Sequence, residues 1–412
     1  MKRQPGKRFY MLIRPGPGAL VAAAFIGPGT IATCSMAGAR FGFALLWGLV
    51  FSVIATLILQ EMAARLGVVA RLGLGEALRK QFHKGPQKIL TAILVISAIA
   101  IGNAAFEAGN ITGATLGLES LGLPAWLSGR AGVIAIGLVT FAVLFSGSYK
   151  LIEGVLVSLV ILMSLTFFMT AVMVRPDING VLQGMFVPAF PSGSLLTIVG
   201  LVGTTVVPYN LFLYASAVQQ RFRQPADLPL ARRDISFSVI LGGLISMAIV
   251  ISSASAFFGS GEVPQGGSDL AVQLEPLLGH WSAWFIGMGL FAAGISSAIT
   301  APLAAAWATA GVLGWSGNLR TWKFRFVWIM ILLSGLAFAL MGFRPLELIL
   351  FAQAANGILL PVVVGYLLRI MNNKEIMGQH ANGWLSNALG ALVMLVVLAL
   401  SVRTLLLVFG VI

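Results

Sequence analysis

Charged residues are scarce in this sequence. Asp, Glu, Lys and Arg make up 9% of its 412 residues, whereas 58% are hydrophobic and the mean hydropathy is +0.96. A water-soluble domain carries about 25% charged residues, so the composition excludes a string of soluble domains and indicates a polytopic membrane protein. The single cysteine, Cys34, excludes an internal disulfide and says nothing about the cellular compartment.

Residue patterns that support enzymatic chemistry are also missing. The chain has three histidines, His83, His280 and His380, and all fall in predicted loops or at the ends of apolar segments. It has no His-Glu-x-x-His zinc motif, no aspartate pair and no serine with a neighbouring base inside an apolar segment. The sequence therefore predicts a protein that is not an enzyme and needs no cofactor.

Long apolar runs are what the chain has in abundance. A helix needs about 20 apolar residues to cross a hydrocarbon core of roughly 30 Å. Eleven segments meet or approach this length: 15–38, 43–64, 89–118, 131–147, 151–174, 193–216, 235–258, 281–314, 324–342, 345–368 and 384–410. We therefore expect an all-α integral membrane protein whose single transmembrane domain covers residues 1–412.

The basic residues indicate how this domain is oriented. With the N-terminus in the cytoplasm, all but five of the 26 Lys and Arg residues fall in the N-terminal segment or in connections on the same side. The five on the outer side are Arg40, Arg130, Arg175, Arg344 and Arg403. This asymmetry predicts a protein of a prokaryotic cytoplasmic membrane with its N-terminus inside and its C-terminus outside. The net charge of +13 then indicates anionic lipid as a partner and no nucleic acid.

Gly27, Pro28 and Gly29 interrupt the first apolar segment near its middle. Proline lacks an amide hydrogen and clashes with the preceding turn, while glycine accepts almost any backbone angle. We therefore expect the first membrane helix to break here, with a simple proline kink as the alternative. Broken backbone at membrane depth is tolerated only inside protein or beside a water-filled cavity.

A second interruption lies at Pro208 in the sixth segment, with polar side chains on both sides of it. Five spans separate the two interruptions, and an odd offset means that the second copy is inserted upside down. Interrupted segments at corresponding positions of two inverted halves point to a substrate site at the midplane of a secondary transporter. A channel is the less favoured alternative, because paired breaks suit a rocking transporter better than a continuous pore.

Several stretches resemble the Nramp divalent-metal transporters. They are Gly27-Pro-Gly-Thr-Ile-Ala-Thr, Gln60-Glu-Met-Ala-Ala-Arg-Leu-Gly-Val-Val, Gly203-Thr-Thr-Val-Val-Pro-Tyr-Asn-Leu-Phe-Leu-Tyr, Leu290-Phe-Ala-Ala-Gly-Ile-Ser-Ser-Ala-Ile-Thr and residues 353–361. The resemblance implies a LeuT-type fold that works by alternating access. Its two inverted five-helix repeats are expected at about 15–174 and 193–368, with helices 1 and 6 broken at mid-membrane and an extra eleventh helix at about 384–410.

The chain departs from this family at the metal-binding positions. Family members usually carry Asp-Pro-Gly-Asn where this sequence has Gly27-Pro-Gly-Thr30, Met-Pro-His where it has Val207-Pro-Tyr209, and a second His at Tyr214. None of the usual carboxylate, amide and thioether ligands for Mn²⁺ or Fe²⁺ is therefore present at these positions. Without them, little compensates a divalent ion for the loss of its water.

Neutral polar side chains remain around the two breaks. If the family geometry holds, the substrate site consists of Gly27, Thr30, Thr204, Thr205, Val207, Tyr209, Asn210, Gln353 and Asn356. Neutral donors and acceptors suit a polar uncharged solute or a cation that keeps its hydration shell. For each residue taken singly, a hydrogen bond to a neighbouring helix is the alternative.

Glu107 lies deep in the third apolar segment, three positions after Ala104, where family members carry a further acidic residue. Intramembrane acids are costly and often functional, so Glu107 is the candidate for carrying a proton or a coupling ion. A neutral Glu107 hydrogen-bonded to Asn103 or Asn110 is the structural alternative.

Together these observations predict an Nramp-related secondary transporter that moves a small solute or cation by alternating access. Its remodelled site is unsuited to dehydrated Mn²⁺ or Fe²⁺. Transport of a hydrated divalent cation such as Mg²⁺ is one alternative, and a non-transporting sensor or scaffold is another. The residues leave open the identity and charge of the cargo, the coupling ion, the direction of transport and the oligomeric state.

Overall fold

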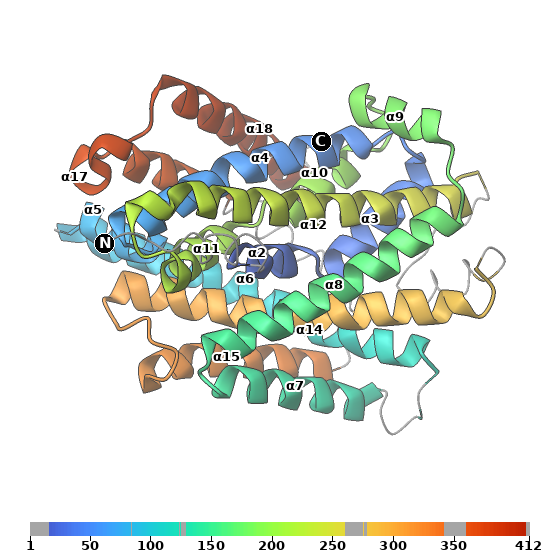
Figure 1. Cartoon of the computed structure of the whole chain (residues 1–412), viewed down its shortest axis with the longest axis horizontal. Helices are drawn as coiled ribbons and strands as arrows, with labels where there is room; N and C mark the ends of the chain where they lie inside the picture. The colour runs from blue at the N-terminus through green and yellow to red at the C-terminus, as the bar shows by residue number, and fades with distance from the viewer. Residues whose placement is uncertain are drawn as a thin grey trace, which may run out of the picture.

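Figure 1 shows a bundle of helices, most of which run along the longest axis of the molecule. The computed structural model describes residues 16–83, 85–122, 124, 129–259, 275, 278–341 and 360–408. Every regular element in these residues is a helix. The prediction of an all-α protein is thus confirmed for the described chain.

Nine stretches of the described chain are long and apolar enough to cross a membrane, if the bent pair α2 (Gly18–Phe25) and α3 (Pro28–Phe41) counts as one span. The other eight are α4 (Leu46–Arg65, continued by a π-helical turn to Ala70), α6 (Gly85–Ser120), α8 (Tyr149–Met173), α10 (Leu195–Thr205) with α11 (Pro208–Arg221), α12 (Leu228–Phe257), α14 (Trp281–Leu313), α15 (Trp322–Leu340) and α18 (Trp384–Val408).

Two shorter apolar helices, α7 (Gly129–Phe145) and Leu360–Met371, stand where the fourth and tenth spans are predicted. Every predicted span therefore has a helical counterpart, although residues 345–359 of the tenth lie outside the described residues. Short helices at the ends of the bundle, among them α5 (Leu74–Gln81), α9 (Ile178–Phe186) and α17 (Lys374–Met377), connect the spans.

The spans differ in how much of each lies inside the protein. In α14, 89% of the most apolar window is buried, compared with 33% in α8 and α15 and 22% in α18. Lipid tails are as apolar as leucine side chains, so exposed apolar surface on the outer helices is not destabilising in a bilayer. Helix α14 therefore forms the centre of the bundle, and α8, α15 and α18 form parts of its lipid-facing wall.

The central contact of the bundle joins α6 to α14 through small residues. A Cβ atom placed on Gly294 of α14 would lie 2.5 Å from Cβ of Ala114 in α6, which no larger side chain could tolerate. Small residues let membrane helices approach closely, where packing rather than hydrophobic expulsion holds them together. This pair provides the fixed support against which the broken helices lie.

The contacts of the two broken helices are related by adding five to the number of each span, with the count returning to one after ten. Helices α2 and α3 of the first span pack against α12 of the seventh, and α10 and α11 of the sixth pack against α4 of the second. The contact between α6 and α14 joins spans three and eight, so the same renumbering gives this contact again. Such a relationship is what two inverted five-helix repeats produce, and it places both breaks in the middle of the bundle.

Candidate functional site

The first break separates α2, which ends at Phe25, from α3, which begins at Pro28, and the two axes meet at an angle of 57°. Gly27 between them is extended, with φ −102° and ψ 177°, and Pro28 occupies the first turn of α3. Because proline has no amide hydrogen, the carbonyl of Ala24 loses the donor that a continuous helix would provide.

The second break is straighter. Helix α10 ends at Thr205 and α11 begins at Pro208, with Val207 extended between them, yet the two halves are aligned closely enough to form one span. The predicted interruptions of helices 1 and 6 are therefore both present, but only the first produces a sharp bend. Val207, which offers no donor atom, lies where the chain crosses from one half-helix to the other.

Hydroxyl groups of the same chain hydrogen-bond to the carbonyl oxygens that the first break releases. Tyr209 donates to the carbonyl oxygen of Ala24 at 2.8 Å. Ser296 and Ser297 of α14 lie 3.1 and 3.3 Å from the carbonyl oxygen of Ala23 and donate to it. Thr30 donates to the carbonyl oxygen of Phe25 across the break. The broken backbone is thus satisfied internally, as burial in a low-dielectric interior requires.

A small cavity of about 20 Å³ lies between the two breaks. It is lined by Ala24, Phe25, Gly27, Gly29, Thr30, Phe106, Asn110, Thr204, Val207, Tyr209 and Ser297. A volume of 10–15 Å³ holds about one water molecule, so in this conformation the cavity accommodates little more than a single water or a bare ion.

The structure brings five of the nine predicted site residues to this cavity: Gly27, Thr30, Thr204, Val207 and Tyr209. Thr205 does not line it and donates to the carbonyl of Leu201 at 3.0 Å, which agrees with the helix-bonding alternative. Asn210 is buried beside the break, and neither polar atom of its side chain has a hydrogen-bond partner in the described part of the chain. Gln353 and Asn356 lie outside the described residues.

Six lining residues are not among the predicted ones: Ala24, Phe25 and Gly29 adjoin the first break, and Phe106, Asn110 and Ser297 come from α6 and α14. Ser297 belongs to the Gly294-Ile-Ser-Ser stretch that carries part of the family resemblance, but nothing in the stretch itself shows that its hydroxyls reach the first helix. Phe106 packs edge-on against Tyr209 with ring centroids 6.2 Å apart. Helix α6 therefore forms one wall of the site.

Glu107 is fully buried, in contact with α15 and beside Asn110, which lines the cavity. A Cβ atom on Gly335 of that helix would lie 2.4 Å from Cγ of Glu107. Neither carboxylate oxygen has a hydrogen bond of good geometry within the described residues. Asn103 donates instead to the carbonyl of Ala301 at 3.0 Å, so the Asn103 form of the structural alternative is wrong. Asn110 is the polar side chain beside Glu107, so the Asn110 form of the structural alternative stays a prediction. A buried acid is expensive, which keeps Glu107 a functional candidate as well.

Asp234 of α12 holds the other end of α2. One carboxylate oxygen accepts the backbone amide of Gly16 at 3.0 Å, and the other accepts that of Gly18 at 2.8 Å. Tyr214, which replaces a family histidine, donates to the carbonyl of Ala231 at 3.0 Å and lies 3.4 Å from Asp234. We call Asp234, Gly16, Gly18 and Tyr214 the α2 latch, because they tie the first half-helix to α11 and α12.

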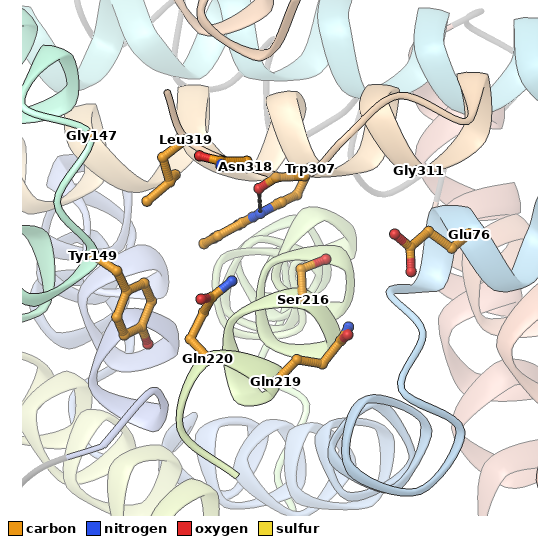
Figure 2. A pocket seen from close by; sticks show the side chains of 11 residues that line it. Glu76, Gly147, Tyr149, Ser216, Gln219, Gln220, Trp307, Gly311, Asn318 and Leu319 are labelled. Atoms are coloured by element: carbon orange, nitrogen blue, oxygen red, sulfur yellow. Dashed lines mark hydrogen bonds between the residues drawn. The ribbon is translucent and has the colours of Figure 1, made fainter. Parts of the chain in front are cut away.

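A larger cavity of about 400 Å³ opens at the end of α11 that points away from the breaks (Figure 2). It is lined by Glu76, Gly147, Tyr149, Ser216, Gln219, Gln220, Trp307, Gly311, Gly317, Asn318 and Leu319. Figure 2 shows Glu76 on one side of it, Tyr149 on the opposite side, and Gln219 and Gln220 below them. Among the described lining residues one is acidic and none is basic, so we call it the polar vestibule.

The described residues contain no group of three or more His, Cys, Asp or Glu side chains that could hold a metal ion. Cys34 is buried within α3. The oxygen atoms at the breaks come from hydroxyls, amides and backbone carbonyls. Such a donor set suits hard cations or water, whereas thioether, thiolate and imidazole ligands favour transition metals.

Comparison with known proteins settles the family. The profile described as Natural resistance-associated macrophage protein-like matches residues 18–407. This chain belongs to the Nramp family. Nramp proteins are membrane transporters, and this member is accordingly a multi-pass integral membrane transporter and not an enzyme.

Two bacterial relatives cover almost the whole of this Nramp protein. Both are named divalent metal cation transporter MntH. The protein of Caldanaerobacter subterraneus subsp. tengcongensis is 28% identical over 92% of this chain and 89% of its own length. That of Yersinia pestis is 27% identical over 97% of this chain and 96% of its own length.

Solved structures confirm the LeuT-type fold. The manganese transporter of Eremococcus coleocola, in complex with an aromatic bis-isothiourea substituted compound, has a TM-score of 0.77 at 20% identity and covers 98% of this Nramp protein and 88% of that chain. MhsT in complex with L-phenylalanine has a TM-score of 0.64 at 15% identity, covering 94% and 98%. At these identities the likeness concerns the fold alone.

Proposed function

We propose that this Nramp protein transports a divalent cation that keeps most of its water, and that dehydrated Mn²⁺ or Fe²⁺ is a poor cargo. Mg²⁺ matches these requirements best, because it prefers oxygen ligands and releases its water reluctantly. The names of the relatives, divalent metal cation transporter and manganese transporter, support a divalent cation as the class of cargo.

The proposal depends on one observation: the carbonyl oxygens released by the first break already accept hydrogen bonds from Tyr209, Ser296, Ser297 and Thr30. A bare cation would have to displace these hydroxyls before it could be coordinated. A hydroxyl that donates to a carbonyl still has lone pairs on its own oxygen, and these can accept hydrogen bonds from metal-bound water. The site therefore favours contact through the hydration shell.

A hydrated cation needs more room than the 20 Å³ between the breaks. Movement of α2 would enlarge this space, because α2 contributes Ala24 and Phe25 to its lining. The α2 latch and the Tyr209–Ala24 hydrogen bond are the contacts that such a movement has to break. Alternating access then consists of making and breaking these contacts around the α6–α14 support.

Helix α11 connects the small cavity to the polar vestibule. Tyr209 lies at its first end and Gln219 at its other end, ten residues or about 15 Å further along the axis. Because the vestibule carries Glu76 and amide oxygens without a basic lining residue, it suits a cation that leaves or enters with its water. The basic residues of the connecting loops support a cytoplasmic location for this end of α11.

Ion uptake by the purified protein in proteoliposomes tests the proposal. With dyes for Mg²⁺ and Mn²⁺ trapped in separate vesicle preparations, we expect saturable Mg²⁺ uptake and negligible Mn²⁺ uptake. Thr30→Val should lower Mg²⁺ uptake, because it removes a lining hydroxyl. Thr115→Val is the matched control, since Thr115 is buried in α6 and its hydroxyl donates only to its own helix at Ile111.

Robust, saturable Mn²⁺ uptake would refute the proposal. If neither ion is taken up and neither ion changes the melting temperature of the protein, a role as a non-transporting sensor or scaffold would be favoured instead. In that case the internal hydrogen bonds at the break would be permanent structural contacts.

A further inference from the structure

A groove of about 510 Å³ runs along the lipid-facing side of the bundle between the first turns of α6 and the last turn of α14. Its lining residues are Arg79, Lys88, Ile89, Ala92, Ile93, Ile96, Ser97, Val312 and Leu313. The positively charged side chains of Arg79 and Lys88 lie at one end of the groove, and apolar side chains form its wall at the other end. This distribution of charge differs from that of the polar vestibule, which has no basic lining residue.

The apolar wall consists of one face of α6. Residues 89, 92, 93 and 96 follow the spacing of neighbours on a helix surface, so their side chains form a continuous stripe. Ile89 and Ile93 are 63% and 57% exposed. From Lys88 to Ile96 the stripe extends about 12 Å along the helix axis, which is long enough for most of an acyl chain segment in one leaflet.

The two cations come from different elements. Lys88 belongs to the first turn of α6, and Arg79 to the last turn of α5. The guanidinium of Arg79 lies over the end of α14, since a Cβ atom on Gly314 would be 2.7 Å from its Nη1. In the described part of the chain neither cation forms an ion pair, and no acidic residue lines the groove.

We propose that this groove binds one anionic phospholipid of the leaflet on the side of the basic loops. Its phosphate lies between Arg79 and Lys88, and one acyl chain lies along Ile89, Ile93 and Ile96. A free phosphate would satisfy the cations but would leave the apolar wall uncovered. A neutral lipid would cover the wall but leave the two charges without a partner. Basic pockets between membrane helices on the cytoplasmic side are suited to anionic head groups.

The site has a consequence for the mechanism that does not depend on the cargo. Its walls belong to α6 and α14, which form the support against which the broken helices lie. A lipid that contacts both helices at their ends strengthens this support and leaves α2 and α11 free to move. Occupancy of the groove should therefore stabilise the folded protein without competing with the transported ion.

Native mass spectrometry of the full chain in nanodiscs of phosphatidylglycerol and phosphatidylcholine tests the proposal. The wild type should retain one phosphatidylglycerol in preference to phosphatidylcholine. Arg79→Gln/Lys88→Gln should lower this retention about 30-fold, given about 1 kcal/mol for each basic residue near the membrane surface. The matched control, Arg233→Gln/Lys374→Gln, removes the same charge from exposed positions outside the groove and should retain the lipid.

Two further measurements distinguish a lipid from a simple anion. Ala92→Phe fills the groove without changing its charge and should also lower retention of phosphatidylglycerol. Millimolar inorganic phosphate should fail to displace the lipid. The proposal is overturned if phosphate displaces it, if Ala92→Phe has no effect, or if the control variant loses as much lipid as the groove variant.

Discussion

Tyr209 at the start of α11 donates its hydroxyl hydrogen to the carbonyl oxygen of Ala24 at the end of α2, over 2.8 Å. The two residues belong to different broken helices and lie 185 positions apart in the chain. Tyr209 stands where the Nramp pattern has a histidine. Here a side chain at the second break hydrogen-bonds to a carbonyl oxygen at the first. The residue that stands in place of the family histidine therefore links the two broken helices across the site.

Tyr209→Phe should destabilise the folded protein. The substitution keeps the ring against Phe106 but leaves the buried carbonyl of Ala24 without a donor, at a cost of about 1–3 kcal/mol. We expect a lower melting temperature in detergent, part of which returns at high Mg²⁺. Tyr366→Phe is the control, because Tyr366 packs edge-on against Phe82 and is only partly buried. Equal melting temperatures for the two variants would show that the Tyr209 hydroxyl contributes nothing.

The sequence was sufficient to predict the membrane class, the breaks and the order of the spans, because each depends on local chemistry. An apolar run of about 20 residues has few alternatives to a membrane helix, and Pro28 and Pro208 remove backbone donors wherever they stand. It was not predictable that the first break bends by 57° while the second stays below 40°. These angles depend on what packs around each break, and both breaks carry similar Gly and Pro signals.

The site was predicted only in part, and the reason is physical. Residues next to a break could be identified from the sequence, so Thr30, Thr204 and Tyr209 were found. Ser297 and Asp234 reach α2 from distant helices, and no periodicity shows which face of a mostly apolar helix meets which neighbour. Glu107 illustrates the same limit, since its depth was predictable and its direction toward Gly335 was not.

Restoring the family ligands should create a transition-metal site. We expect Gly27→Asp/Thr30→Asn/Val207→Met to bind Mn²⁺ at least tenfold more tightly than the wild type, about 1.4 kcal/mol, by calorimetry. The structure adds one condition: a Cβ atom at residue 27 would lie 2.9 Å from Oγ of Ser297. Adding Ser297→Ala should therefore strengthen binding further. If neither the triple nor the quadruple variant binds Mn²⁺, the correspondence with the family positions is wrong.

The α2 latch should control access to the cavity between the breaks. Asp234→Asn leaves a single side-chain oxygen to accept two backbone amides, and hydrogen bonds to charged groups contribute about 1.5–3 kcal/mol each. We expect a cysteine at Thr204, in a Cys34→Ala background, to react with a water-soluble maleimide about tenfold faster when Asp234→Asn is present. Gly18→Ala should act alike, because its Cβ would lie 2.6 Å from Oγ of Ser238.

Asp177→Asn provides the control for the latch. Asp177 also accepts two backbone amides, those of Asn179 and Gly180 at 3.1 Å each, but it caps the peripheral helix α9. Its substitution should leave the labelling rate at Thr204→Cys unchanged. Equal acceleration by Asp177→Asn and Asp234→Asn would mean that the rate reports general loosening of the protein and would remove the latch from the mechanism.

Glu107→Gln should abolish the pH dependence of transport while leaving the fold intact. Glutamine has nearly the same shape and cannot exchange a proton, so a role in proton or coupling-ion transfer is lost while the packing against Gly335 is kept. Uptake into proteoliposomes measured from pH 5 to 8 checks this, with Glu119→Gln as the control, because Glu119 lies at the end of the same helix and accepts the amide of Gly129 at 3.0 Å. A buried neutral amide costs less than a buried charge, so the melting temperature should not fall. An unchanged pH profile would assign Glu107 a structural role, as a permanently neutral carboxyl group beside Asn110.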